Sequence, residues 1–332
     1  MSVLAAPDAA PDAVPARTLR LELTGPERAA IRQLAGELAG TAPALLDDHD
    51  WLAEARRLSC RLPLRLLEGL RELRQDSGRG LFVLAGLPID VGTLPNTPTV
   101  AGSVERLPRL PAAVAMLLGQ QLGEVVAYRD EKQGALVQNV VPVSSLAHTQ
   151  SNAGSVQLEL HNENAFHPHR PDLIGLLCLR TDHEGRAGTL VASIRDALAL
   201  LTEDELALLR APRFVTEAPP SFGAGGATEP HPLLGGSPTD PDIRVDFNAT
   251  AGLDDEAGGA MAGLGAALLA SASSLVLRPG EMVFIDNRLV VHGRTDFTPR
   301  YDGRDRWLHR IYVHLDSRRS AGSRTGRGPV LI

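Results

Sequence analysis

Near the start of the chain, apolar residues recur at the spacing of one helix face, at Ile31, Leu34 and Leu38. Thr24 can cap the first turn, and Glu27 three residues later completes a capping box. This pattern predicts a helical N-terminal part over residues 19–120. Within it we expect helical segments over residues 44–75 with a break near Pro63, a buried strand at 80–88, a loop over 94–110 and a helix at 111–122.

From about residue 124 the pattern changes to short apolar runs that are separated by turn residues. Many short strands of this kind are typical of a sandwich, a jelly roll or a barrel. The segment 218–241 is rich in glycine and proline and is too long for a simple connection, so we expect either disorder or, preferably, an active-site lid. The runs are "EVVAY", "ALVQNVVPV", "SVQLELH", "LIGLLCLR", "GTLVASI", "IRVDF", "LVL", "MVFID", "LVVH" and "RWLHRIYVHL", with helical patterns at 195–210 and 255–272.

Composition narrows the class of protein. The 332 residues carry a net charge of −7, which argues against nucleic-acid binding because that role needs a clustered basic face. Two cysteines, Cys60 and Cys178, provide neither a disulfide framework nor a zinc spacing, and no apolar run is long enough to span a bilayer. Residues 1–18 lack the features of a signal peptide and are typical of a disordered tail. A cytoplasmic protein is the simplest expectation.

The stretch "ELHNENAFHPHR" at 159–170 concentrates histidines and glutamates. Before it, apolar and polar residues alternate with period two, and on a strand this alternation puts His161 and Glu163 on the same face. One imidazole and one carboxylate supply two of the three protein ligands in the 2-His-1-carboxylate iron site. His167 and His169 lie beyond the expected end of the strand, so we do not assign them to the site.

A third ligand and two cations lie far downstream. His292 ends a strand in "DNRLVVHGR", and in a closed antiparallel fold it can face the first pair. Arg306 and Arg310 are four residues apart in "RWLHRIYVHL", which places both on one strand face and makes them suitable partners for two carboxylates. The competing interpretation is an all-β module with histidines on its surface, since H-x-E triplets often occur by chance. That interpretation leaves the two arginines unexplained.

These segments also carry a family resemblance. "HNENAFHPHRPDLIGLLCLR", "GRAGT", "DNRLVVHGR" and "FTPRYDGRDRWLHR" occur in the order and at the separations found in the clavaminate synthase-like family of Fe(II)/2-oxoglutarate-dependent oxygenases. The resemblance covers the chain from about residue 20 to the end. Within the family, "EKQGALVQNVVPV", "NAGS" and "HNENAFH" are most similar to members that hydroxylate free L-asparagine.

The resemblance implies a double-stranded β-helix (jelly-roll) core over about residues 121–316, in a single domain over 19–332. It implies that Fe(II) is bound by His161, Glu163 and His292 and that 2-oxoglutarate is bound by Arg306 and Thr189, with O2 as the second cosubstrate. For the amino-acid substrate it implies contacts from Arg310, Glu131, Asn152 and Asp246. Each substrate contact also has a plainer explanation: Glu131 can be a solvated turn residue, Asn152 a turn residue and Asp246 a backbone partner.

The implied reaction is hydroxylation of the β-carbon (C3) of a free L-α-amino acid, with asparagine as the first candidate. Arginine hydroxylases of the family have a second acidic residue just after the counterpart of Asp246, whereas this chain has "DFNAT". Glu163 argues against a halogenase, which gives up that carboxylate. The alternatives are the same chemistry on lysine, arginine, glutamine or another amino acid, as in an antibiotic pathway, or a non-catalytic metal- or small-molecule-binding module. The pattern does not indicate an oligomeric state.

Overall fold

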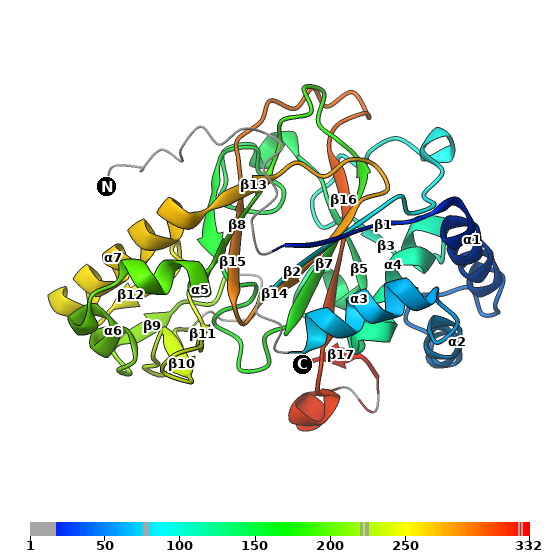
Figure 1. The fold of residues 1–332 in the computed structure, drawn as a ribbon. Coiled ribbons are helices and arrows are strands. Elements are labelled where there is room, and N and C mark those ends of the chain that lie inside the picture. Colours follow the sequence, from blue (N-terminus) through cyan, green and yellow to red (C-terminus); the bar gives the residue numbers. More distant parts are fainter. Residues whose placement is uncertain (1–17, 76–79, 220–221, 223–225, 325, 327) are drawn as a thin grey trace.

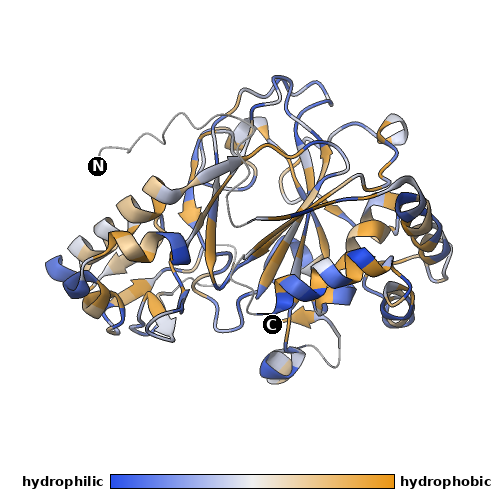
Figure 2. Ribbon diagram, viewed as in Figure 1, coloured by the Kyte–Doolittle hydropathy of each residue, from blue (hydrophilic) through white to orange (hydrophobic). Residues whose placement is uncertain are grey.

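Two β-sheets form the centre of the protein, and helices cover their outer sides (Figure 1). The computed structural model describes residues 18–75, 80–219, 222, 226–324, 326 and 328–332. Helices from the N-terminal third lie on one side of the sheets, and helices from the chain between residues 194 and 271 lie on the other (Figure 1). The strands are largely hydrophobic, whereas the outer helices carry hydrophilic stretches on exposed positions (Figure 2).

The larger sheet has nine strands and is built around β7 and β16. These two long strands pair antiparallel, and β14 pairs with the other edge of β7. Along β16, the first half pairs with β5 and the second half with β4. The strands are β1 (Leu19–Glu22), β2 (Leu81–Ala85), β14 (Met282–Asp286), β7 (Leu173–Arg180), β16 (Trp307–His314), β4 (Glu124–Tyr128), β17 (Val330–Leu331), β5 (Val137–Val140) and β3 (Val104–Glu105).

The smaller sheet has four strands in the order β13-β8-β15-β6, and it faces the larger sheet across a cavity. Its strands are β13 (Ser273–Leu275), β8 (Thr189–Ser193), β15 (Val290–Arg294) and β6 (Leu158–His161). The described residues also form two short two-stranded antiparallel sheets. They consist of β10 (Leu234–Gly236) with β11 (Pro241–Ile243), and of β9 (Phe214–Thr216) with β12 (Thr250–Gly252).

The helices stabilise the sheets from outside. Helix α1 begins with the expected capping box between Thr24 and Glu27. Helix α4 is buried along most of its length because it packs between β16 and helices α1 and α2. The α-helices are α1 (Gly25–Ala39), α2 (His49–Ser59), α3 (Leu64–Arg74), α4 (Leu110–Leu122), α5 (Ile194–Ala197), α6 (Glu203–Leu209) and α7 (Asp255–Ser271). Short 3₁₀ turns occur at Val91–Thr93, Lys132–Gly134, Ser144–Leu146, Leu198–Leu200 and Ser317–Ser323.

Most of the expected elements are confirmed, including the break at Pro63 between α2 and α3. Three expectations need correction. The strand expected to end at His292 continues to Arg294 in β15, so His292 lies in its middle. The loop at 94–110 contains the short strand β3, because Val104 and Glu105 add to the edge of β5. The run "IRVDF" is not a continuous strand: β11 ends at Ile243, and Asp246 forms only an isolated bridge to His161.

Some sequence expectations remain predictions. The tail at 1–18 lies outside the described residues except for its last residue, and so do five positions of the 218–241 segment. The division into one domain with a lid is therefore still an expectation. Among the described residues, no helix combines the length and apolar character that a membrane crossing requires.

The centre of the larger sheet supports a prediction about packing. A methyl group added at Gly175 in β7 would lie 2.6 Å from Met282 Cε and 2.9 Å from both Ile311 Cγ1 and Phe284 Cε1. These neighbours are fully or almost fully buried, so we expect Gly175→Ala to destabilise the fold by about 1–3 kcal/mol through overpacking.

Gly259→Ala is the matched control. Gly259 is exposed in α7, and a methyl group there meets no atom within 4 Å. Alanine is the better helix former, so this change should stabilise by up to about 1 kcal/mol. Urea denaturation of the three proteins measures both effects. A Gly175→Ala protein as stable as the wild type would contradict the packing argument.

Candidate active site

A cavity of about 740 Å³ lies between the two sheets. Residues of the smaller sheet line one wall, and residues of β7 and β16 line the opposite wall. Every residue that the sequence analysis selected for the site lines this cavity, although the selected positions span 180 residues of the chain. They are Glu131, Asn152, His161, Glu163, Thr189, Asp246, His292, Arg306 and Arg310.

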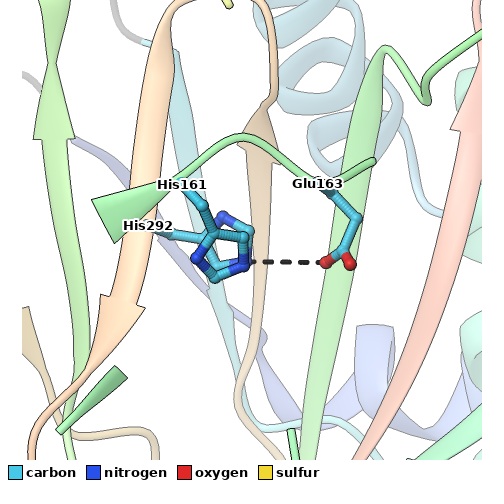
Figure 3. A group of neighbouring side chains, drawn as sticks. All are labelled: His161, Glu163 and His292. Atoms are coloured by element: carbon cyan, nitrogen blue, oxygen red, sulfur yellow. Dashed lines mark ion pairs between the residues drawn. The ribbon is translucent and has the colours of Figure 1, made fainter. Parts of the chain in front are cut away.

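Two histidines and one glutamate converge at the cavity wall (Figure 3). His161 ends β6 and lies directly opposite His292 of β15 in the strand register, with ring centroids 4.4 Å apart. His292 Nε2 lies 3.6 Å from Glu163 Oε2, and one potential ligand atom from each residue lies within 4.8 Å of the others. This spacing allows one cation to contact all three side chains.

The position of Glu163 corrects the sequence argument. Strand β6 ends at His161, so Glu163 does not share a strand face with it and instead reaches the cavity from the turn that follows. Two buried asparagines build this turn. Asn162 donates to the Asn287 carbonyl at 2.8 Å, and the Glu163 N–H donates to Asn287 Oδ1 at 2.8 Å. The strand interpretation was therefore wrong in its geometry, although the turn still brings Glu163 close to His161 and His292.

Asn162 and Asn287 were not singled out from the sequence. Asn162 Oδ1 accepts from the Val245 N–H at 2.9 Å, and Asn287 Nδ2 donates back to the Glu163 carbonyl at 3.1 Å. Their two amides therefore connect the turn that carries Glu163 to the turn before β15. An asparagine flanked by His161 and Glu163 was the available signal, because a buried amide can satisfy several backbone groups at once.

The chemistry of the three side chains fits a divalent metal. Glu163 Oε2 is buried and accepts no hydrogen bond within the described part of the chain, as expected for an oxygen that contacts a cation. The Nδ1 atom of His161 lies 2.9 Å from the Glu159 carbonyl, which leaves Nε2 for a metal. Burial lowers the pKa of His292 and favours the neutral imidazole that binds metals.

Burial by itself opposes ionisation of Glu163. The nearby Arg310 guanidinium and the imidazole of His292 outweigh that effect, so the pKa of Glu163 lies well below its usual range. The carboxylate is therefore present in its metal-binding form at neutral pH.

Arg306 is a buried cation without a carboxylate partner among the described residues. Its Nη2 lies 3.5 Å from Thr189 Oγ1 on β8, which is its single hydrogen bond there. Burial lowers the pKa of Arg306, and the charges of Cys178 and Asp182 offset only part of that effect. Arginine pairs well with a carboxylate, so this part of the cavity suits an anionic ligand.

Arg310 has a different environment, because its guanidinium is held by several partners. Nη1 donates to Glu163 Oε1 at 2.9 Å, Nη2 pairs with Glu131, and Nε donates to Gln138 Oε1 at 3.1 Å. Tyr312 donates to the same Glu131 oxygen at 2.9 Å. Burial favours a lower pKa for Arg310, but the two carboxylates outweigh it and raise the pKa. One arginine thus links the candidate metal ligand to a second acid.

Asn152 and Asp246 line the same cavity from different loops. The side chain of Asn152 is half-buried and forms no hydrogen bond to other described residues. Asp246 bridges to His161 through its backbone, and its carboxylate accepts from the Asn248 N–H at 2.9 Å. The backbone role considered for Asp246 is therefore present, and its position on the cavity wall is present as well.

A second cluster of side chains that could bind a metal lies outside the lining of this cavity. It consists of His183, Asp302 and Asp305. Asp302 accepts from the Arg304 N–H at 2.8 Å and Asp305 accepts from the Arg300 N–H at 2.7 Å. These bonds are typical of carboxylates that hold a turn. The main cavity is therefore the better candidate for a metal centre.

Comparison with known proteins identifies the class. The model of the taurine catabolism dioxygenase TauD, TfdA family matches residues 46–312. The chain belongs to this family of Fe(II)/2-oxoglutarate-dependent oxygenases. It is 46% identical to L-asparagine oxygenase of Streptomyces coelicolor over 97% of this chain and 98% of the relative. It is 38% identical to L-lysine 3-hydroxylase of Catenulispora acidiphila over 94% and 88% of the two chains.

Solved structures agree with this assignment. Asparagine oxygenase in complex with Fe(II), 2S,3S-3-hydroxyasparagine and succinate matches with a TM-score of 0.92 and 46% identity, over 94% of this chain and 98% of that chain. The non-haem iron oxygenase OrfP in complex with Fe and α-ketoglutaric acid matches with a TM-score of 0.85 and 31% identity, over 94% and 100%. The expected double-stranded β-helix fold is thereby confirmed, and the oxygenase uses iron and 2-oxoglutarate.

The three converging side chains support a prediction about metal binding. Glu163→Gln replaces the charged oxygen pair with a neutral amide, so we expect the affinity of the apoprotein for Co(II) to fall roughly tenfold or more. His49→Ala serves as the control, because His49 is exposed on α2 and remote from the cavity lining. Isothermal titration calorimetry measures both proteins. Equal Co(II) affinity in Glu163→Gln and wild type would exclude this glutamate as a ligand.

Proposed function

We propose that this oxygenase hydroxylates the β-carbon (C3) of a free L-α-amino acid, with L-asparagine as its substrate. The observation that carries the proposal is the Glu131–Arg310 ion pair in the cavity wall. A free amino acid is a zwitterion, so it presents one carboxylate and one ammonium group close together. The carboxylate can pair with Arg310 and the ammonium group with Glu131, each replacing a partner of opposite charge.

The remaining charged groups suit the two cofactors. We assign Fe(II) to His161, Glu163 and His292, whose unsatisfied buried oxygen and neutral imidazole match a 2-His-1-carboxylate site. We assign the distal carboxylate of 2-oxoglutarate to Arg306 and Thr189, since this arginine lacks a protein carboxylate. The two arginines would then hold two different carboxylates: Arg306 lies just before β16, and Arg310 lies within it.

Asparagine is favoured over a cationic amino acid by the polar groups around the cavity. The free amide of Asn152 can both donate to and accept from a substrate amide. Asp246 is followed by Phe247 and Asn248, so no second carboxylate stands next to it to receive a guanidinium. The resemblance to asparagine oxygenase supports the same choice.

A lysine substrate is the second candidate. Glu159 and Glu217 both line the cavity and are exposed, so either carboxylate can meet a side-chain ammonium group. The likeness to L-lysine 3-hydroxylase favours this alternative as well. No comparable feature of the described cavity lining favours arginine or glutamine as the substrate, or a non-catalytic binding role.

The protein's part in the reaction is to hold and orient the reactants. Bound iron and 2-oxoglutarate supply the oxidising chemistry: O2 is consumed, 2-oxoglutarate becomes succinate and CO2, and one oxygen atom enters the substrate. Arg310 also contacts Glu163, so Arg310 and Glu131 would hold the two charged groups of the amino acid beside the proposed metal centre. Buried Arg306 and Arg310 mark the interior from which solvent is excluded, and closure of the proposed 218–241 lid would complete the exclusion.

The proposed activity is tested by turnover. Protein reconstituted with Fe(II) and 2-oxoglutarate without oxygen is exposed to air with L-asparagine, L-lysine, L-arginine or L-glutamine, and succinate and added oxygen are measured by mass spectrometry. We expect coupled succinate and hydroxyasparagine. If succinate and an oxygenated product form only with lysine, asparagine is excluded as the substrate, and the enzyme class stands. No product with any amino acid would refute the proposed function.

Substitutions of Arg306 and Arg310 are expected to raise the KM for different substrates. Arg306→Met should raise the KM for 2-oxoglutarate roughly tenfold or more and change the KM for asparagine little, because it removes a charge-assisted contact to the cosubstrate. Arg310→Met should raise the KM for asparagine instead. Steady-state kinetics with each substrate varied in turn measures both. If both substitutions lowered only thermal stability, the assignment of the two carboxylates would be wrong.

A further inference from the structure

Lys132 is the single lysine of the chain, whereas the other 32 of its 33 basic residues are arginines. It follows Glu131 directly and lines the cavity. Its side chain is half-buried, and Nζ donates to the Asn139 carbonyl of β5. A compact ammonium group satisfies one carbonyl, whereas an arginine fork brings five N–H groups that need partners. A lysine therefore suits this position better than the residue that the chain uses elsewhere.

The backbone at Lys132 is strained. Lys132 has a φ of 45°, Gln133 of 57° and Gly134 of 68°, so three consecutive residues adopt left-handed conformations. Only the last of them is a glycine, and such conformations cost free energy in residues with a side chain. The turn is held by Arg106 Nη2, which donates to the Gln133 carbonyl at 2.9 Å, and by the Gly134 N–H, which donates to the Glu131 carbonyl at 3.0 Å.

This turn connects the two halves of the proposed amino-acid site. Glu131 stands at its start and contacts Arg310 and Tyr312 through its carboxylate. Asn139 follows Gln138, whose side-chain oxygen accepts from Arg310. The Lys132–Asn139 bond thus ties the residue after Glu131 to the strand segment that holds Arg310. Burial and Arg310 lower the pKa of Lys132 to about 7, whereas Glu131 and Glu163 oppose that shift, so the ammonium belongs to the same charge network.

We infer that Lys132 is a positioning residue for substrate binding: its bond to the Asn139 carbonyl holds the left-handed turn in the conformation that presents the Glu131 carboxylate to the ammonium group of the amino acid. The inference rests on the proposed function, since it needs Glu131 to contact the substrate. A merely structural role for Lys132 would affect stability and all ligands together. A positioning role affects the amino acid selectively.

The test measures binding without turnover. Protein loaded with Mn(II) and 2-oxoglutarate is titrated with L-asparagine by calorimetry under anaerobic conditions, and the affinity for 2-oxoglutarate is measured separately. We expect Lys132→Met and Lys132→Gly to weaken asparagine binding roughly tenfold, as for the loss of a charged buried hydrogen bond, with the affinity for 2-oxoglutarate changed less than about twofold.

Gln133→Gly is the matched control. Gln133 has the same left-handed backbone but is exposed, does not line the cavity and keeps its carbonyl bond to Arg106 when its side chain is removed. Glycine relieves the strain, so this variant should have an equal or higher Tm and bind asparagine like the wild type. Lys132→Gly relieves the same kind of strain and should therefore have a Tm no lower than that of Lys132→Met. If Lys132→Gly still binds asparagine more weakly than the wild type, the loss of affinity reflects positioning and not lost stability.

Glu131→Gln distinguishes the possible failures. If Glu131→Gln weakens asparagine binding and the Lys132 variants do not, the role of Lys132 is refuted and the proposed function stands. If Glu131→Gln binds asparagine like the wild type, the proposed Glu131 contact is wrong, and the inference fails with it. If all variants lose affinity for 2-oxoglutarate as well, Lys132 is a structural residue. Should the wild type turn over another amino acid, that amino acid replaces asparagine in the titration.

Discussion

The buried guanidinium of Arg310 is the group on which the organisation of the site depends. It contacts Glu163 of the candidate metal centre, Glu131 of the proposed substrate site and Gln138 of the neighbouring strand. A buried cation of this kind is tolerated only when its N–H groups and its charge are satisfied. Glu163 lies far along the chain from Glu131 and Gln138, so the guanidinium also helps determine how these segments are placed relative to one another.

The two sheets contribute different side chains to the cavity around this network. The smaller sheet carries His161 and His292 opposite each other on paired strands, and their rings lie next to each other. The larger sheet carries Arg310 on β16, with Arg306 just before that strand. The two histidines proposed as metal ligands and the two arginines proposed to bind carboxylates thus come from opposite walls, and the proposed reactants would lie between two rigid layers. Rigid layers suit a reaction in which one C–H bond has to be selected among several.

The elements of the fold could be predicted from the sequence more completely than the geometry of the site. Helix α1 was recognisable from Thr24, Glu27 and its apolar spacing, since capping and periodicity are local properties. The strands around β7, β14 and β16 were recognisable for the same reason. The turn that carries Glu163 was not, because it depends on Asn162 and Asn287, which are 125 residues apart. Spacing indicated the candidate metal ligands and the two arginines, whereas the division of the site between 2-oxoglutarate and the amino acid came only from the family resemblance.

The amino-acid sequence by itself determined the kinds of elements, the class of fold and the residue types available for chemistry, because these follow from periodicity, capping and motif order. The Lys132 turn and the Glu131–Arg310 pair were decided only by the tertiary structure. So was the position of Glu163 beyond the end of β6. The physical reason is that these features depend on which backbone and side-chain groups meet across strands distant in the chain. Such meetings are set by strand register and burial, which short segments do not encode.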